Sequence, residues 1–220
     1  LQDKRGFMWF STWDGLCKFD GYNFYTYKIQ QGDIYHMRSN RIDYIKEDKY
    51  GNIWTLPYDQ EPHRFDPRTE TFMGLRSLPE YKDFTFNATE IIPTKSGKVW
   101  LISEKMGCVC VSDSTFNVEL FNTDNKKIQA NQVYGIHEDN EKNTWLLTNN
   151  GLYSLSPDNK KISKIFSEKE TATGKNLQDF YCAEESDDQI WFGSDKGRIW
   201  IHDKKSGQFE LLKTPTNSTI

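Results

Sequence analysis

The stretch Gln189-Ile190-Trp191-Phe192-Gly193-Ser194-Asp195-Lys196-Gly197-Arg198-Ile199-Trp200-Ile201 decides the fold, because the chain repeats its pattern. Similar stretches surround four earlier tryptophans, Trp9, Trp54, Trp100 and Trp145. The five tryptophans follow one another at steps of 45, 46, 45 and 46 residues. A period this long and this regular indicates a repeat architecture.

Each repeat contains four short apolar runs separated by glycine, proline, asparagine and aspartate. The second copy is the clearest, with runs at 40–48, 53–56, 63–66 and 71–73. None of these runs is long enough for a helix or keeps a 3.6-residue period. Four strands in a repeat of about 45 residues are typical of a β-propeller blade. The sequence therefore predicts an all-β chain built from four-stranded antiparallel blades.

The predicted blades cover approximately residues 1–27, 40–73, 88–121, 131–166 and 179–212, and residues 213–220 begin a further blade. Besides the five tryptophans, we expect Gly15, Gly151 and Gly197 to be structural positions of the repeat. Because the first blade lacks most of its opening strand, we expect a fragment of about five blades from a larger propeller. A closed ring of five blades is the alternative.

Composition excludes several classes of function. The 220 residues carry a formal charge of −4 and form no basic stripe, so we expect no nucleic-acid binding through this segment. No run of about 18 apolar residues is present, so we expect no membrane contact through it either. Cys108 and Cys110 are too close for a zinc knuckle and are expected to be buried free thiols. A disulfide through Cys17 or Cys182 stays open, and no metal or cofactor is expected.

Three motifs carry a resemblance to a known family. These are Glu47-Asp48-x-x-Gly51-Asn52-Ile53-Trp54, the run from Trp9 to Phe24, and Ile190-Trp191-Phe192-Gly193-Ser194-x-x-Gly197. Together they resemble the two-component-regulator propeller repeat of the periplasmic sensor region of Bacteroides-type hybrid two-component systems. The resemblance extends through all five copies, and the opening residues 1–10 are similar to the start of the first blade in such sensors.

This resemblance implies a periplasmic segment of a seven-bladed propeller in an inner-membrane-anchored sensor. The rest of such a protein would supply further blades, a β-sandwich, a histidine kinase and a transcriptional output. It implies an oligosaccharide ligand and a homodimeric full-length protein. No phospho-acceptor residue of the kinase or receiver can be placed on this chain.

Long loops on a rigid scaffold are where binding residues gather, and one edge of each predicted blade carries such loops. The candidate ligand-binding residues there are Trp13, Asp14, Tyr35, His36, Arg38, Tyr58, Asp59, Gln60, His63, Lys105, Asn149, Asn150, Asp195 and Lys196. Trp13 suits stacking on a sugar ring, and carboxylates or amides beside it suit sugar hydroxyls. Packing of Trp13 on a neighbouring loop is the alternative. His36 and His63 have no third ligand in register, which argues against zinc.

Two other functions were compared with the sensor. A propeller enzyme of the streptogramin-lyase type needs a positioned histidine–glutamate pair, and His137 beside Glu138 is not accompanied by the rest of that pattern. A protein–protein scaffold of the WD type lacks its Gly-His and Trp-Asp signatures here. We therefore expect no catalytic residue and predict a non-catalytic segment that senses oligosaccharides and signals to a histidine kinase.

Overall fold

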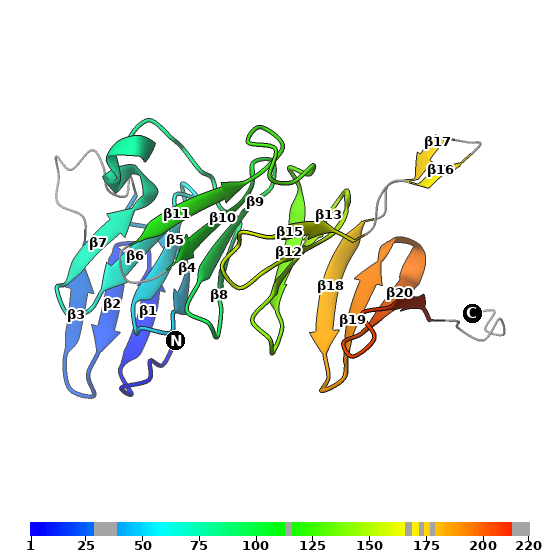
Figure 1. Ribbon diagram of the computed structural model, residues 1–220. Helices are drawn as coiled ribbons and strands as arrows, with labels where there is room; N and C mark the ends of the chain where they lie inside the picture. The colour runs from blue at the N-terminus through cyan, green and yellow to red at the C-terminus, as the bar shows by residue number, and fades with distance from the viewer. Residues whose placement is uncertain (29–38, 113–115, 166–168, 172–173, 177–178, 213–220) are drawn as a thin grey trace. The chain divides into compact units, whose positions relative to one another are not determined.

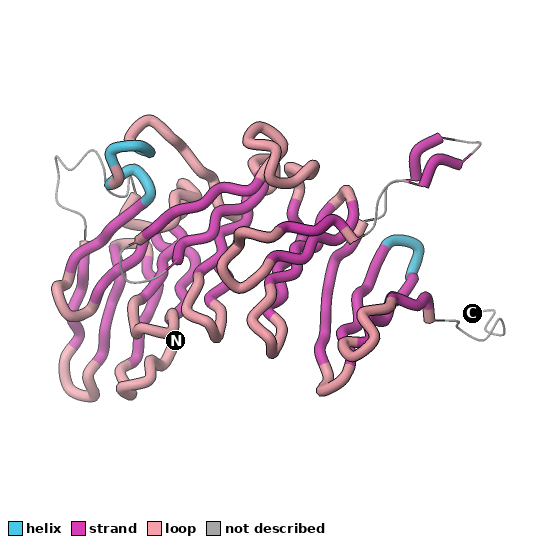
Figure 2. The backbone as a smooth tube through the Cα atoms, viewed as in Figure 1, coloured by secondary structure: helices cyan, strands magenta, loops and turns pink. Residues whose placement is uncertain are grey.

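The computed structural model describes residues 1–28, 39–112, 116–165, 169–171, 174–176 and 179–212. Strands and loops make up almost all of these residues, as Figure 2 shows. The helical segments among them are three single turns of 3₁₀ helix, η1 (Leu75–Ser77), η2 (Pro79–Tyr81) and η3 (Asp195–Gly197). No helix in this described part of the chain is both long and apolar enough to cross a bilayer.

The chain divides into two compact units, of which the first comprises Leu1–Lys126. It contains a three-stranded sheet followed by two four-stranded sheets (Figure 1). Their strands, each antiparallel to its neighbours, are β1 (Met8–Thr12), β2 (Gly15–Phe19), β3 (Phe24–Tyr27); β4 (Ile42–Glu47), β5 (Ile53–Pro57), β6 (His63–Asp66), β7 (Thr71–Gly74); and β8 (Glu90–Pro93), β9 (Val99–Ser103), β10 (Gly107–Ser112), β11 (Asn117–Phe121). Ahead of β1, Gln2 forms an isolated bridge with Met8.

The second unit comprises Lys127–Ile220 and holds two further four-stranded antiparallel sheets. Their strands are β12 (Val133–Glu138), β13 (Thr144–Thr148), β14 (Gly151–Leu155), β15 (Ile162–Lys164); and β18 (Phe180–Glu185), β19 (Gln189–Ser194), β20 (Arg198–Asp203), β21 (Phe209–Leu211). A short pair, β16 (Lys169–Thr171) and β17 (Gly174–Asn176), lies between them, where the sequence predicted only a loop. The predicted beginning of a further blade, residues 213–220, lies outside the described residues.

One hydrogen-bonded motif recurs before the second strand of three blades. Asp48 Oδ1 accepts from the backbone N–H groups of Tyr50 and Asn52, and its Oδ2 accepts from Asn52 Nδ2 and Trp54 Nε1 at 2.9 and 3.0 Å. Asp3 contacts Trp9 and Asp139 contacts Trp145 in the same way, each pair at 2.9 Å. We call this arrangement the Asp–Trp clasp. It ties each turn to an indole in the core, because a buried N–H left without an acceptor is costly.

In the first blade the clasp also favours the charged form of its aspartate, Asp3. Burial alone would raise the pKa of Asp3, but hydrogen bonds from the Trp9 indole and from the backbone of Phe7 and Arg5 hold that pKa below its usual value. The third blade has Thr94 at the equivalent position, and there the buried indole N–H of Trp100 has no acceptor in the described structure.

Within each unit the clasped indoles pack on the following blade. The ring centres of Trp9 and Phe65 lie 5.7 Å apart, and Trp54 stacks on Phe116 with the ring centres also 5.7 Å apart. In the second unit Trp145 lies 5.2 Å from Phe192. Such aromatic contacts bury large apolar areas, so the core of each unit is assembled between blades.

Trp191 departs from the predicted pattern. Four of the repeat tryptophans are at most 5% exposed, whereas Trp191 is 37% exposed although Ile190 and Phe192 beside it are fully buried.

The predicted repeat glycines occupy the left-handed region of the backbone, with φ of +125° at Gly15, +96° at Gly151 and +66° at Gly197. A side chain at Gly15 would also collide with the carbonyl oxygen of Tyr27. The second blade, which has no glycine in this turn, places Gln60 there with φ of +63°. The turn therefore fixes the backbone and leaves the tip residues free to vary.

The first strands of the second, fourth and fifth blades share an irregularity in their pairing. The register shifts between Ile42 and Tyr44, between Val133 and Gly135, and between Phe180 and Cys182. A β-bulge of this kind leaves one residue unpaired and re-aims its side chain. The unpaired residues are Asp43, Tyr134 and Tyr181, of which Asp43 and Tyr181 are exposed and Tyr134 is half-buried.

The cysteines agree in part with expectation. Cys108 and Cys110 are buried free thiols, and burial raises the pKa of Cys108 well above its usual value. Cys17 is half-buried and Cys182 is exposed, and both are free thiols, so neither forms a disulfide.

Candidate functional site

Three side chains of the first unit form an exposed cluster at the loop edge of the first two blades. Trp13 lies in the turn between β1 and β2, Tyr58 directly follows β5, and Arg41 directly precedes β4. The Arg41 guanidinium carbon lies 4.7 Å from the centre of the Trp13 ring and 4.4 Å from that of Tyr58. Trp13 is 81% exposed and Tyr58 is 63% exposed, so most of both rings faces solvent. We call these residues the aromatic–arginine cluster.

Arg41 is held by two contacts with its own blade. Its carbonyl oxygen accepts from the Tyr58 N–H at 3.0 Å, which brings the two residues together. Its Nε donates to Asp43 Oδ1 at 2.8 Å, and Asp43 is the residue that the β-bulge exposes. The guanidinium therefore has a defined position between two aromatic rings, where cation–π attraction adds to the hydrogen bond.

The Trp13 turn is fixed by short-range bonds. Thr12 Oγ1 donates to the Gly15 carbonyl at 2.7 Å and accepts from the Asp14 N–H at 3.1 Å. The Asp14 carboxylate pairs with Lys28 Nζ, and both side chains are largely exposed. The turn thus presents an indole and a carboxylate side by side, with the indole packed against Arg41 rather than buried under a loop.

Of the remaining candidates in this unit, one is not on the surface. His63 is fully buried in β6, where its Nδ1 lies 2.8 Å from the Glu61 carbonyl oxygen and its ring fills the space above Gly74. The prediction that His63 binds ligand is therefore wrong, because the loop ends before it and a strand carries it inward. Asp59 accepts from the Glu61 N–H at 3.3 Å, Gln60 occupies the positive-φ position of the turn, and Lys105 is exposed between β9 and β10.

Two loop positions of the second unit make the same backbone hydrogen bond as Tyr58 of the first unit. The N–H of Asn149 donates to the Gln132 carbonyl, and that of Asp195 to the Asp179 carbonyl, as Tyr58 does to Arg41. Asn150 is engaged internally, since its Nδ2 donates to the Gln129 carbonyl at 2.6 Å and its Oδ1 accepts from Lys164 at 3.0 Å.

Asp195 is an ion-pair partner in the same unit. Its carboxylate accepts from Arg198 at 3.0 Å, while Lys196 is exposed with φ of +58°. The predicted candidates Tyr35, His36 and Arg38 lie outside the described residues.

The sequence did not reveal a second polar–aromatic group in this unit. The hydroxyls of Tyr134 and Tyr181 both donate to Asp179 Oδ2, at 3.1 and 3.2 Å, and their rings lie 4.7 Å apart. Burial, together with the Asp179 carboxylate, raises the pKa of Tyr134 to about 12. Both tyrosines are the bulge residues of their strands, a position that the sequence alone does not mark.

Two of the described histidines, His137 and His202, have contacts with neighbouring side chains. His137 Nε2 lies 3.5 Å from Glu185 Oε2, but Glu185 is already engaged by Lys204 Nζ at 2.5 Å and the Asn140 N–H at 3.0 Å. His202 stacks on Phe209 at 4.3 Å, and burial lowers its pKa. Within the described ranges, no three His, Cys, Asp or Glu side chains are grouped to hold a metal ion.

Comparison with solved structures decides the fold. The extracellular domain of the putative hybrid two-component system BT3049 from B. thetaiotaomicron superimposes with a TM-score of 0.61 at 22% identity, over 96% of this chain. The chain is a β-propeller segment. It spans 29% of the length of that domain. The expected all-β fold of about five antiparallel blades is confirmed, and the first blade has three strands because most of its opening strand is lacking, as expected.

Other solved structures share the propeller segment's fold at lower identity. PorZ, a component of the type-IX secretion system of Porphyromonas gingivalis, has a TM-score of 0.58 at 14% identity, covering 96% of this chain and 33% of its own. YCF48 bound to D1 peptide has a TM-score of 0.54 at 10% identity, covering 89% and 60%. No family model matches the chain, and no curated protein matches it.

Proposed function

We propose that this propeller segment is a non-catalytic, ligand-sensing part of the extracytoplasmic region of a hybrid two-component sensor, and that it binds oligosaccharide. The fold similarity to the BT3049 extracellular domain supports the sensor assignment. The observation that carries the ligand class is the aromatic–arginine cluster. An exposed indole and phenol beside a fixed guanidinium suit a sugar, whose ring stacks on aromatic faces while its hydroxyls take hydrogen bonds.

The polar groups around the cluster match this chemistry. The Nε of Arg41 donates to Asp43, and this is one of the five N–H donors that a guanidinium has. Asp43 and Asp14 are 44% and 72% exposed at their side chains, which leaves carboxylate oxygens open to accept from hydroxyls. Ligand binding changes a sensor's output only when the ligand favours one arrangement of the protein over another.

The test is calorimetric titration of the full chain with neutral di- to tetrasaccharides of glucose, galactose, mannose and xylose. Trp13→Ala and Tyr58→Ala should each weaken binding about tenfold, since one aromatic contact contributes about 1 kcal/mol or more. Tyr22→Ala is the matched control, because Tyr22 is 91% exposed and lies at the opposite end of β2 from Trp13.

Two results would count against the proposal. Equal affinity of Trp13→Ala and Tyr22→Ala for a bound saccharide would remove the cluster from the site. Binding of extended peptides, with no saccharide bound, would favour a protein-interaction scaffold instead.

A further inference from the structure

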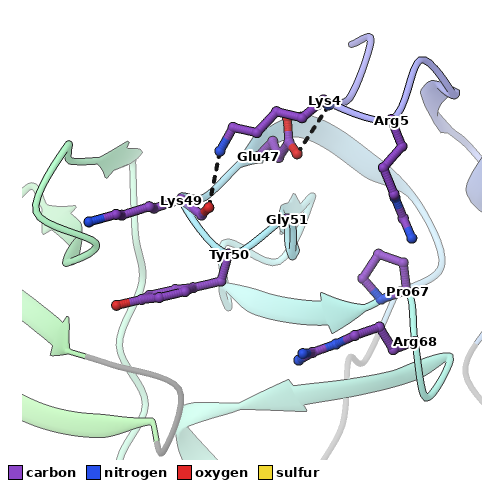
Figure 3. Close-up of a pocket in the computed structure, with 8 residues that line it drawn as sticks. All are labelled: Lys4, Arg5, Glu47, Lys49, Tyr50, Gly51, Pro67 and Arg68. Carbon is purple, nitrogen blue, oxygen red and sulfur yellow. Dashed lines mark hydrogen bonds between the residues drawn. The ribbon is translucent and has the colours of Figure 1, made fainter.

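A second concave site lies in the first unit at the other end of β1 from Trp13. It encloses about 260 Å³ among the turn before β1, the β4–β5 turn and the β6–β7 turn. Figure 3 shows the side chains that carry the argument, Lys4, Arg5, Glu47, Lys49, Tyr50 and Arg68. Small-molecule sites usually measure about 300–1,000 Å³, so this pocket suits a small ion or a single ring.

The pocket is basic although the chain as a whole is acidic. Four cations and one carboxylate line it, whereas the chain has a formal charge of −4. The carboxylate, Glu47, is engaged by the Lys4 N–H at 3.2 Å, and Lys4 Nζ donates to the carbonyls of Asp48 and Lys49 at 3.0 and 3.1 Å. These bonds, two of which are dashed in Figure 3, hold the turn before β1 against the β4–β5 turn. They do not involve the two arginines of the pocket.

An aspartate positions each of the two arginines without engaging all of its N–H donors. Arg68 donates through Nε and Nη2 to the Asp66 carboxylate at 2.9 and 2.7 Å, and this hydrogen bonding lowers the pKa of Asp66 to about 2. Arg5 Nη2 lies 3.5 Å from Asp3 Oδ2. Because a guanidinium has five donors in a rigid fork, each arginine keeps N–H groups for a further acceptor. Figure 3 shows Pro67 between them.

The fold itself does not require these charges. The turn from Asp139 to Asn143 makes the same backbone and carboxylate bonds as the turn from Asp48 to Asn52. At the positions of Lys49 and Tyr50 it carries Asn140 and Glu141, neither of them basic. The repeat thus supplies its own comparison, in which an equal turn folds without a cation at the position of Lys49.

An aromatic wall completes the pocket. Tyr50 is 47% exposed, and its hydroxyl lies against Gly97, where an added Cβ would come within 2.6 Å of it. The glycine therefore allows the phenol to lie over the next turn, with its ring bordering the pocket.

We infer that this pocket binds an oxyanion, the carboxylate or sulfate group of a small ligand. Arg5 and Arg68 supply the hydrogen bonds, Lys49 adds positive charge while its Nζ donates to the Ser96 carbonyl oxygen at 3.4 Å, and the Tyr50 ring borders the body of the ligand. Charge-assisted hydrogen bonds from guanidinium to carboxylate or sulfate are among the stronger polar contacts. The site is separate from the aromatic–arginine cluster and does not depend on it.

The experiment is titration of the full chain with sodium sulfate, sodium glucuronate and neutral glucose, at constant ionic strength balanced with chloride, followed by amide NMR shifts. Sulfate and glucuronate should shift the Lys49–Gly51 amides and glucose should not. Arg5→Gln and Lys49→Gln should each weaken binding about tenfold. Lys95→Gln, an exposed lysine on the third blade's turn, is the matched control and should change nothing.

Each outcome decides. Binding of glucuronate without sulfate assigns a carboxylate ligand, and the reverse assigns a sulfate ligand; both support the site. Shifts equal for glucose and glucuronate, an effect of Lys95→Gln as large as that of Lys49→Gln, or no shifts with either anion would overturn it. Trp13→Ala should leave anion binding unchanged, so failure here and failure of the saccharide proposal are distinguishable.

Discussion

Removing the carboxylate of one Asp–Trp clasp should destabilise the first unit strongly. Asp48 is 3% exposed and accepts four hydrogen bonds, two from backbone N–H groups and two from the side chains of Asn52 and Trp54. Asp48→Ala removes the two oxygens that accept these four hydrogen bonds and leaves the indole N–H facing the space that the carboxylate filled. Because the surrounding turn is closed over it, the indole N–H cannot readily find water.

The magnitude follows from the buried donors. Asn52 and Trp54 are 3% and 1% exposed, and an unpaired buried donor costs about 1–3 kcal/mol. Three such donors, the Asn52 N–H, the Asn52 Nδ2 and the Trp54 Nε1, give about 3–9 kcal/mol before the turn relaxes, and the backbone N–H of Tyr50, at the exposed turn, regains solvent. We therefore expect Asp48→Ala to lower the free energy of unfolding by about 4 kcal/mol, a large part of the roughly 5–15 kcal/mol of a typical domain.

The assay is urea unfolding of the full chain followed by tryptophan fluorescence, with Thr94→Ala as control. Thr94 holds the same position in the third blade, but the Trp100 indole has no acceptor there, so its loss should cost only about 1 kcal/mol. Conversely, Thr94→Asp should supply the missing acceptor and stabilise the unit. Equal effects of Asp48→Ala and Thr94→Ala would refute the reasoning.

Three further outcomes are expected. The pKa of Asp66 is lowered to about 2, so the carboxylate's contribution to stability is complete above its unfolded pKa near 3.8 and is lost as pH falls through 2. Between pH 5 and pH 2 the urea midpoint of Asp66→Asn should therefore fall less than that of the parent protein. Gly107→Ala, with φ of +79° and a Cβ that would collide with a carbonyl oxygen, should cost about 3 kcal/mol or more, whereas Gly197→Ala, with φ of +66° and open space, should cost about 1 kcal/mol by the same measurement. Trp145→Ala should cost about 3–5 kcal/mol and Trp191→Ala clearly less, because only the former indole is covered; equal thermal shifts would contradict this.

The repeat made the blades predictable because each tryptophan occupies the same strand position. Its period depends on residues close in sequence, and these define strands and turns locally. Burial is different, since it depends on the neighbouring blade: an isoleucine precedes both Trp54 and Trp191, but Trp54 is 1% exposed and Trp191 is 37% exposed. The position of a residue in its own repeat therefore predicts the strand in which it lies, but not whether a neighbouring blade buries its side chain.

The candidate site was partly predictable. Trp13 and Tyr58 were predicted to lie in loops because polar residues between apolar runs indicate loops, and both lie outside the strands. Arg41 was missed, since its position depends on a register shift at Asp43 and on a contact between two blades. His63 was assigned wrongly because the loop after Tyr58 ends sooner than its composition indicated.

The indole contacts between blades have a direction that matters when the protein is made. Trp9 is covered by Phe65, Trp54 by Phe116 and Trp145 by Phe192. Each indole is therefore covered only after residues roughly 47 to 62 positions later in the chain have been synthesised. A chain emerging from the ribosome at about 5–20 residues per second leaves such a ring bare for several seconds. Because each blade is covered by the next one to be synthesised, only about one repeat of the nascent chain is uncovered at a time. This limits the apolar surface that is exposed to chaperones or to other chains.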